Sequence, residues 1–169
     1  QHDLYRVTAE IKNISEENYG DVRYFRTFDW SIDPTADDEY VTHHGTTCTQ
    51  VERAYNNGFC SPNPNNYCHS LGSLYGDFVV VGPFDHGSTF EFKLGSLEKM
   101  SSTSITFYYG LSQSDGGMTT AEEKMLYALS SVGANVYSLG QSSIYHPSSG
   151  SRGNPYTFAF SYKCSDDER

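Results

Sequence analysis

The chain has 169 residues, a formal net charge of -10, and 15% aromatic but only 19% charged residues. A chain of this length can bury one hydrophobic core, so we expect a single domain over residues 1–169. The acidic charge argues against a nucleic-acid partner, because phosphate recognition relies on clustered Lys and Arg. No apolar run approaches the roughly 20 residues of a membrane helix, so we expect no membrane span.

Alternating apolar and polar residues predict that most of the chain forms β-strands. In residues 4–12, one face carries Tyr5, Val7, Ala9 and Ile11. In residues 22–32, Arg26 interrupts an otherwise apolar face, so its side chain either extends to the edge of the sheet or pairs with a carboxylate. Further strands are predicted at residues 39–43, 49–55, 77–82, 89–95, 103–110, 136–141 and 156–164.

One helix is predicted in TTAEEKMLYALSSVG, residues 119–133. Thr119 or Thr120 can serve as N-cap with Glu122 or Glu123 three residues later, and Gly133 can serve as C-cap. The apolar stripe on one face indicates packing against the core; it comprises Met125, Leu126, Leu129 and Val132. The fold expected is an antiparallel β-sandwich of the jelly-roll or immunoglobulin-like type, with one short α-helix near residues 120–132.

The four cysteines lack any CxxC pair, which favours two disulfides over a zinc or redox site. Cys60 and Cys68 flank the short Pro/Asn-rich segment SPNPNNY, which a local disulfide can close. That pairing leaves Cys48 with Cys164. Four cysteines allow three connectivities, and the spacing does not choose among them.

Several features predict a secreted protein. Disulfides form in oxidising compartments, and the chain begins at Gln1 without Met, as a mature exported protein does after signal removal. The tripeptide NIS makes Asn13 a candidate N-glycosylation site.

The stretch FDWSIDPTADDEYVTHHG, residues 28–45, gathers five carboxylates without a Lys or Arg. Carboxylates and turn carbonyls suit calcium, and the candidate ligands are Asp29, Asp33, Asp37 and Asp38. The spacing is not that of an EF-hand. Two alternatives stay open: a solvated acidic loop paired with Arg23, Arg26 or Arg53, and a glycosidase that uses two of the carboxylates.

Other catalytic signatures are absent from the sequence, which contains no GxSxG, HExxH, Walker or GxGxxG motif, and we expect no enzyme. His43 and His44 are adjacent on a predicted strand and therefore point to opposite faces, so they cannot chelate one ion together. His86, beside Asp85, is expected to bond a neighbouring loop. The fourteen tyrosines leave carbohydrate binding as an alternative, through rings such as Tyr67, Tyr75 and Tyr109.

Several segments together resemble a family of exported bacterial proteins, uncharacterised in function, that often carry a PEP-CTERM sorting signal. The matching segments span most of the chain in order: YRVTAEIKN, DVRYFRTFDWSIDPTADDEYVT, NNGF, GPFDHGSTFEFKLGSL, ITFYYG, AEEKMLYALSSVGANVYSLGQ and TFAFSY. The segment CSPNPNNYCHS and Cys164 depart from the family pattern and suggest a disulfide-stabilised relative. The resemblance implies an extracellular β-rich domain of surface or matrix proteins, without an activity that carries over.

The function expected is that of a non-enzymatic extracellular subunit, structural or adhesive, that self-assembles as a homo-oligomer or polymer. The terminal strands are the expected contact, through strand addition at an exposed sheet edge. The alternatives are a lectin-like carbohydrate-binding module and a glycoside hydrolase.

Overall fold

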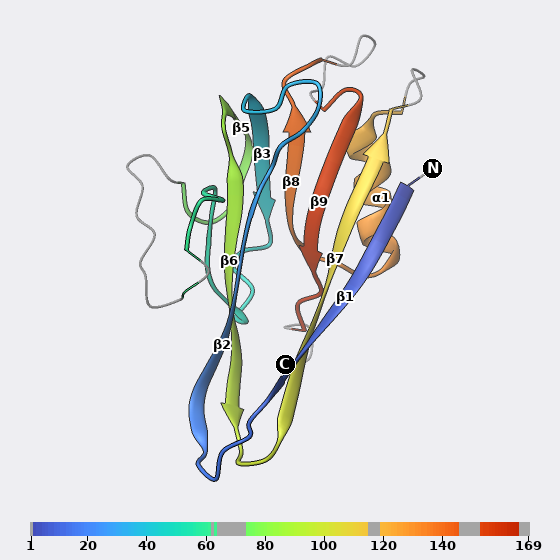
Figure 1. Cartoon of the computed structure of the whole chain (residues 1–169). Coiled ribbons are helices and arrows are strands. Elements are labelled where there is room, and N and C mark those ends of the chain that lie inside the picture. The colour runs from blue at the N-terminus through green and yellow to red at the C-terminus, as the bar shows by residue number, and fades with distance from the viewer. Residues whose placement is uncertain (1, 62, 64–73, 115–118, 146–152, 166–169) are drawn as a thin grey trace.

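The described strands form two antiparallel sheets of unequal width (Figure 1). The computed structural model of the chain describes residues 2–61, 63, 74–114, 119–145 and 153–165. Its elements in chain order are β1 (His2–Lys12), β2 (Tyr19–Asp29), β3 (Glu39–His44), β4 (Val51–Tyr55), β5 (Phe78–Phe84), β6 (Gly87–Leu97), β7 (Ser102–Gln113), α1 (Ala121–Ser131), β8 (Val136–Ser142) and β9 (Tyr156–Tyr162).

The larger sheet has the strand order β1-β7-β9-β8-β3-β5, and the smaller has the order β2-β6-β4. All strand pairs are antiparallel. The predicted β-sandwich with one short helix is therefore confirmed. No helix in the described ranges is long and apolar enough to cross a bilayer.

Two of the connections between the sheets are held together by one residue. β1 continues into β2 and β6 into β7, and both turns lie at the same end of the molecule (Figure 1). Asn13 ties the turns together: its backbone N–H donates to Ser101 O at 2.9 Å, and its Nδ2 donates to Glu98 O at 3.0 Å. Its side chain also bonds within its own turn, because Nδ2 donates to Glu17 O at 2.7 Å.

Asn13 is only 5% exposed, so in the folded chain the amide nitrogen of the sequon is occupied by carbonyl groups rather than presented to solvent. Glycosylation at Asn13 stays a prediction from the sequence. The structure gives this residue a different role, in which its side chain donates to carbonyl groups of both turns.

Aromatic side chains fill the space between the sheets. The ring of Phe160 in β9 lies 4.9 Å from Phe28 in β2, 5.2 Å from Phe90 in β6 and 5.5 Å from Phe107 in β7. Phe160 and Phe90 are fully buried. The predicted alternation of β2 is confirmed for its core face, but the strand ends at Asp29 rather than at residue 32. Beyond this end the backbone N–H of Trp30 donates to His86 O, and the Trp30 side chain is still buried.

Helix α1 covers the outer face of the larger sheet, away from the smaller sheet (Figure 1). The capping box is confirmed at Thr120, whose Oγ1 accepts from Glu123 N, while the Glu123 carboxylate accepts from Thr120 N. The C-cap is Val132, one residue before the predicted Gly133, which has a φ of 69°. Met125 packs directly on Gly110 of β7, where a Cβ atom would lie 2.6 Å from the Met125 sulfur.

A disulfide joins Cys48, after β3, to Cys164, after β9, across a sequence separation of 116 residues. The expected pairing of these two cysteines is confirmed. Cys60 is buried, and none of the described cysteines is a free thiol. Its expected partner, Cys68, lies outside the described residues.

We predict that replacing both Cys48 and Cys164 by Ser lowers the free energy of unfolding by about 4 kcal/mol, because the disulfide closes a long loop and restricts the unfolded chain. Urea unfolding of the variant and the parent measures this difference. Alkylation without reduction, read by intact mass, is the control and should label none of the four cysteines. A loss below about 1 kcal/mol would contradict the prediction.

Candidate functional site

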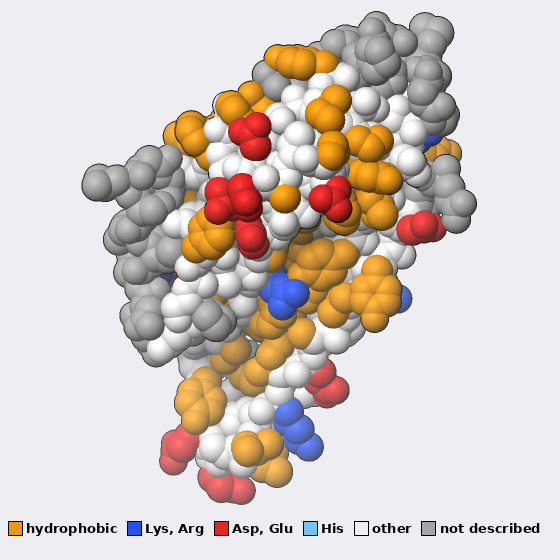
Figure 2. Space-filling model, turned by 45° about the horizontal axis from the view of Figure 1, so that its top comes forward, with side chains coloured by type: hydrophobic (Ala, Val, Ile, Leu, Met, Phe, Trp, Pro, Cys, Tyr) orange, Lys and Arg blue, Asp and Glu red, His pale blue; other side chains and the backbone are white. Residues whose placement is uncertain are grey.

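The unequal width of the sheets leaves one side of the sandwich open. β1 is the last strand of the larger sheet and β2 is the last strand of the smaller one. We call the space between the inner face of β1 and β7 and the edge strand β2 the β1–β2 groove. Half-buried apolar side chains border it: Val7, Ala9 and Ile11 of β1, Tyr24 and Phe28 of β2, and Tyr109 of β7. Figure 2 shows hydrophobic side chains gathered in a hollow around a basic one.

Two apolar side chains of this region are more exposed than the rest. Tyr5 of β1 is 71% exposed, and Leu111 of β7 is 39% exposed. Tyr5 lies directly opposite Tyr109 in the β1–β7 register, so it continues the inner aromatic face of the sheet to the edge. The smaller sheet does not reach far enough to cover it.

Arg26 is the cation of the β1–β2 groove. It occupies the core-facing row of β2 between Tyr24 and Phe28. Its Nε donates to Tyr109 Oη at 2.6 Å, and its guanidinium carbon lies 5.5 Å from the Tyr109 ring centroid and 5.9 Å from that of Phe107. Burial raises the pKa of Tyr109, and the Arg26 charge partly offsets this. The guanidinium thus rests on two aromatic faces, as cation–π pairs do.

No carboxylate of the described ranges pairs with Arg26. The other two arginines of the smaller sheet, Arg23 and Arg53, differ in this respect. Arg23 Nη1 lies 3.0 Å from Glu91 Oε1, and Arg53 Nε lies 2.9 Å from Glu91 Oε2. Glu91 follows Phe90 in the strand, so this network lies on the face away from the core. Arg26 alone brings an uncompensated charge into the apolar groove.

The acidic loop that follows Trp30 is organised by its own backbone and by Glu39. Glu39 is fully buried, and its Oε1 accepts hydrogen bonds from Ile32 N at 3.1 Å and from Asp37 N at 2.9 Å. Burial raises the pKa of Glu39, and these backbone donors oppose the shift. Asp37 has a φ of 69°, which its bond to Glu39 helps to hold. The carboxylate that closes this loop is thus Glu39.

The structure does not assemble the four predicted calcium ligands into one set. Burial raises the pKa of Asp29, and the charges of Asp85 and Asp37 raise it further. Asp38 Oδ2 instead accepts from Ser143 Oγ at 3.3 Å. The described residues contain no group of three or more His, Cys, Asp or Glu side chains that could hold a metal ion. Calcium binding therefore stays a prediction, measurable as a change in melting temperature between added calcium and chelator.

The histidines have structural partners. His43 is buried and His44 is exposed, so the prediction that they point to opposite faces is confirmed. His43 belongs to a buried chain that crosses between the sheets: its Nε2 lies 2.8 Å from Ser88 Oγ, and Ser88 Oγ lies 2.7 Å from Ser138 Oγ. Trp30 Nε1 donates to Ser138 Oγ at 3.3 Å. Burial lowers the pKa of His43 to about 3, which keeps the ring neutral.

His86 also bonds a neighbouring loop, as predicted, with Nδ1 3.5 Å from Asn56 O. Burial lowers the pKa of His86. Neither His43 nor His86 reaches solvent, so neither is placed to exchange a proton with a substrate.

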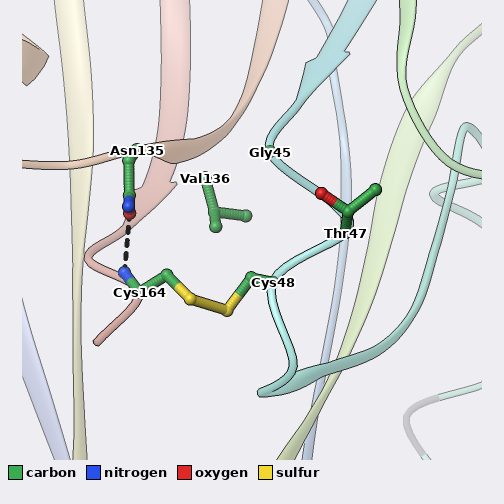
Figure 3. A pocket seen from close by; sticks show the side chains of 6 residues that line it. All are labelled: Gly45, Thr47, Cys48, Asn135, Val136 and Cys164. Carbon is green, nitrogen blue, oxygen red and sulfur yellow. Dashed lines mark hydrogen bonds between the residues drawn. A yellow bond between two sulfur atoms is a disulfide. The ribbon is translucent and has the colours of Figure 1, made fainter. Parts of the chain in front are cut away.

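A shallow depression of about 200 Å³ lies over the disulfide (Figure 3). Its walls are Gly45, Thr47, Cys48, Asn135, Val136 and Cys164. Asn135 Oδ1 accepts from Cys164 N at 2.7 Å, so its side chain braces the end of β9. The depression has no titratable side chain in its wall, and we assign it no chemistry.

Sequence reasoning noticed Arg26 but not its partner. The interruption of an apolar face by one Arg is the signal, and it predicts an unusual environment without naming Tyr109. Both terminal strands were expected at an exposed edge, but β9 lies between β7 and β8, whereas β1 is an edge strand. The residues of the two strands do not distinguish these places, because strand order is set by the whole sheet. No family model, curated protein or solved structure matches this chain.

We predict that Glu39→Gln changes the pH dependence of stability. A raised pKa means that the folded chain binds the proton more tightly, so this carboxyl favours folding at low pH, and the benefit is lost as pH rises from its ordinary pKa of 4.5 through the raised value. Relative to the parent, the free energy of unfolding of Glu39→Gln should therefore rise between pH 4.5 and pH 7. Urea unfolding at several pH values measures it.

Glu39→Ala is the control for the loop contacts. It removes the acceptor for Ile32 N and Asp37 N and should lower the free energy of unfolding by about 2 kcal/mol relative to Glu39→Gln at every pH, because neither variant titrates at this position. A difference between Glu39→Gln and the parent that does not vary with pH would contradict the assignment.

We predict that Arg26→Met leaves the free energy of unfolding unchanged or raises it by up to about 1 kcal/mol, because an apolar side chain of similar length avoids the desolvation of an unpaired cation. Urea unfolding measures the difference, with Tyr109→Phe as the matched control that removes only the hydroxyl. If Arg26→Met lowers the free energy of unfolding by more than about 1 kcal/mol, the guanidinium stabilises the fold, which would contradict its assignment to a binding surface.

Proposed function

We propose that the chain is a non-enzymatic extracellular subunit, structural or adhesive, that self-assembles through the open side of its sandwich. One observation carries the proposal: the long, regular edge of β1 has no strand partner in the described part of the chain and borders the apolar β1–β2 groove. An unpaired edge offers backbone N–H and C=O groups to a further strand, and apolar side chains beside it add burial.

The edge of β1 is suited to pairing because it is regular. Each residue of this eleven-residue strand has a partner in β7, from His2 opposite Ser112 to Lys12 opposite Ser102, without a register shift. The backbone groups that point away from β7 therefore repeat evenly along the free side. A second strand finds an unbroken row of donors and acceptors there.

The opposite edge of the same sheet, β5, is protected. Its pairing with β3 contains two register shifts. Val80 has a φ of 51°, and Pro83 has no N–H to donate. Bulges and proline are the usual protection of a sheet edge, because they prevent a continuous ladder. This asymmetry favours β1 as the assembling edge.

The compartment proposed is extracellular. The Cys48–Cys164 disulfide is compatible with it, since such bonds persist in oxidising surroundings. The resemblance to exported bacterial surface and matrix proteins supports the same placement. The glycoside hydrolase stays an alternative with no observation in its favour, and one of its five candidate carboxylates, Glu39, is fully buried.

Carbohydrate binding is the second candidate, and the composition of the β1–β2 groove favours it. Sugars stack on aromatic faces and bond to charged donors. Tyr5 and Tyr109 provide rings, and Arg26 provides a cation that no described carboxylate neutralises. The β1–β2 groove is therefore the binding surface for a carbohydrate, whereas self-assembly uses the edge of β1 that borders it.

We predict that the full chain associates with rising concentration and that deletion of residues 1–5 abolishes association while most of the β-sheet circular dichroism remains. The deletion shortens the free edge and removes Tyr5 from its inner face. Light scattering after gel filtration measures mass, and electron microscopy records filaments or sheets.

Val79→Ser on β5 is the matched control, because Val79 is 75% exposed on the opposite edge; it should associate as the full chain does. Association of the truncated chain would place the contact elsewhere. A full chain that stays monomeric at high concentration would refute self-assembly and make carbohydrate binding the leading function.

A further inference from the structure

We propose that β1 pairs with β1 of a second copy of this chain, antiparallel and two-fold symmetric, with Thr8 opposite Thr8 of the second copy. This inference rests on the proposed self-assembly and specifies its first contact. The pairing joins two larger sheets into one continuous sheet.

The charges on the outer face of β1 favour one register of the β1–β1 pairing. Arg6, Thr8, Glu10 and Lys12 alternate with the inner residues and are all exposed. Within the described ranges, Arg6, Glu10 and Lys12 form no ion pair. When Thr8 faces its own copy, Arg6 faces Glu10 of the second strand and Glu10 faces Arg6. Symmetry therefore gives two complementary cross-strand pairs.

Neighbouring registers lose this complementarity. If the two-fold axis passes through Val7, Arg6 faces Thr8. If it passes through Ala9, Arg6 faces Lys12, and two like charges lie opposite each other. Directly opposed like charges destabilise an antiparallel pair, so the register centred on Thr8 is favoured over both.

The inner face of β1 fits the same register. Tyr5 faces Ile11 of the second strand, and Val7 faces Ala9. An aromatic ring opposite a β-branched side chain is a favourable cross-strand pair. The pairing covers Tyr5, which the single chain leaves 71% exposed.

The net charge of the molecule makes this surface distinctive. The chain carries a formal charge of -10, which opposes association of two copies. β1 contains two acidic residues, Asp3 and Glu10, and two basic ones, Arg6 and Lys12, so its formal charge is zero apart from His2. Charges on an edge strand usually discourage pairing. Here their order makes the strand complementary to itself.

Charge reversal tests the register. In Arg6→Glu, both cross-strand pairs become like-charged, and the same holds for Glu10→Arg. Each variant should associate at least about tenfold more weakly than the full parent chain, measured by analytical ultracentrifugation. Circular dichroism and the melting temperature should stay close to those of the parent, because both side chains are exposed.

The decisive measurement is an equimolar mixture of the two variants. In a mixed dimer, the glutamate introduced at position 6 faces the arginine introduced at position 10, and the unchanged Glu10 faces the unchanged Arg6. Association should therefore return in the mixture as a mixed dimer, and also in the double variant Arg6→Glu/Glu10→Arg.

Each outcome decides the inference. Weak single variants, with recovery in the mixture and in the double variant, support it. Single variants that associate as the parent does, or a mixture that fails to recover, overturn the β1 pairing while the proposed self-assembly stands on another surface. A parent chain that stays monomeric at every concentration overturns both.

Discussion

The ring of Phe160 holds the two sheets together, and its position decides which part of the molecule stays open. Its neighbours are Phe28 and Phe90 from the smaller sheet and Phe107 from the larger one. Burial of aromatic surface on this scale dominates core energetics. In this cluster, β9 and β7 face β2 and β6. The smaller sheet has only three strands, and its edge strand β2 does not extend over β1. The overhang of β1, its free edge and the β1–β2 groove all follow from this offset.

Local signals predicted the elements of this fold well. Alternation located the strands, and the reciprocal contacts of Thr120 and Glu123 located the start of the helix. The order of the strands in the sheets could not be predicted from the sequence. Alternation indicates which side chains share a face, but it does not indicate which strands are neighbours. The end of β2 was missed for a related reason. Trp30 continues the apolar pattern, but its backbone bonds to His86, a residue far along the chain.

The candidate site was only partly predictable. Five carboxylates within one short stretch suggested a cation, yet the buried Glu39 accepts hydrogen bonds from backbone N–H groups of the same loop. Counting charges in the sequence does not distinguish this role from metal ligation. Arg26 attracted notice as a break in an apolar face. Its partner Tyr109 lies 83 residues away, so the cation–π contact and the missing carboxylate emerge only when the sheets are assembled. Self-complementary charge along β1 was present in the sequence, but it has meaning only for a strand known to be an edge.

The two-fold axis of the β1 pairing is perpendicular to the sheet, so it leaves inner faces on one side and the helices on the other. Both β1–β2 grooves then open on the same side of a single rigid body. An isologous contact of this kind closes on itself, so it alone gives two copies, and growth into filaments or sheets requires a second contact surface. The proposed dimer would therefore be bivalent: a ligand that repeats along a polymer would meet two identical grooves at once, and avidity can exceed the affinity of one groove by about 10²–10⁴ without a new contact. A polymer that binds a single groove too weakly to retain a monomer could in this way retain the dimer.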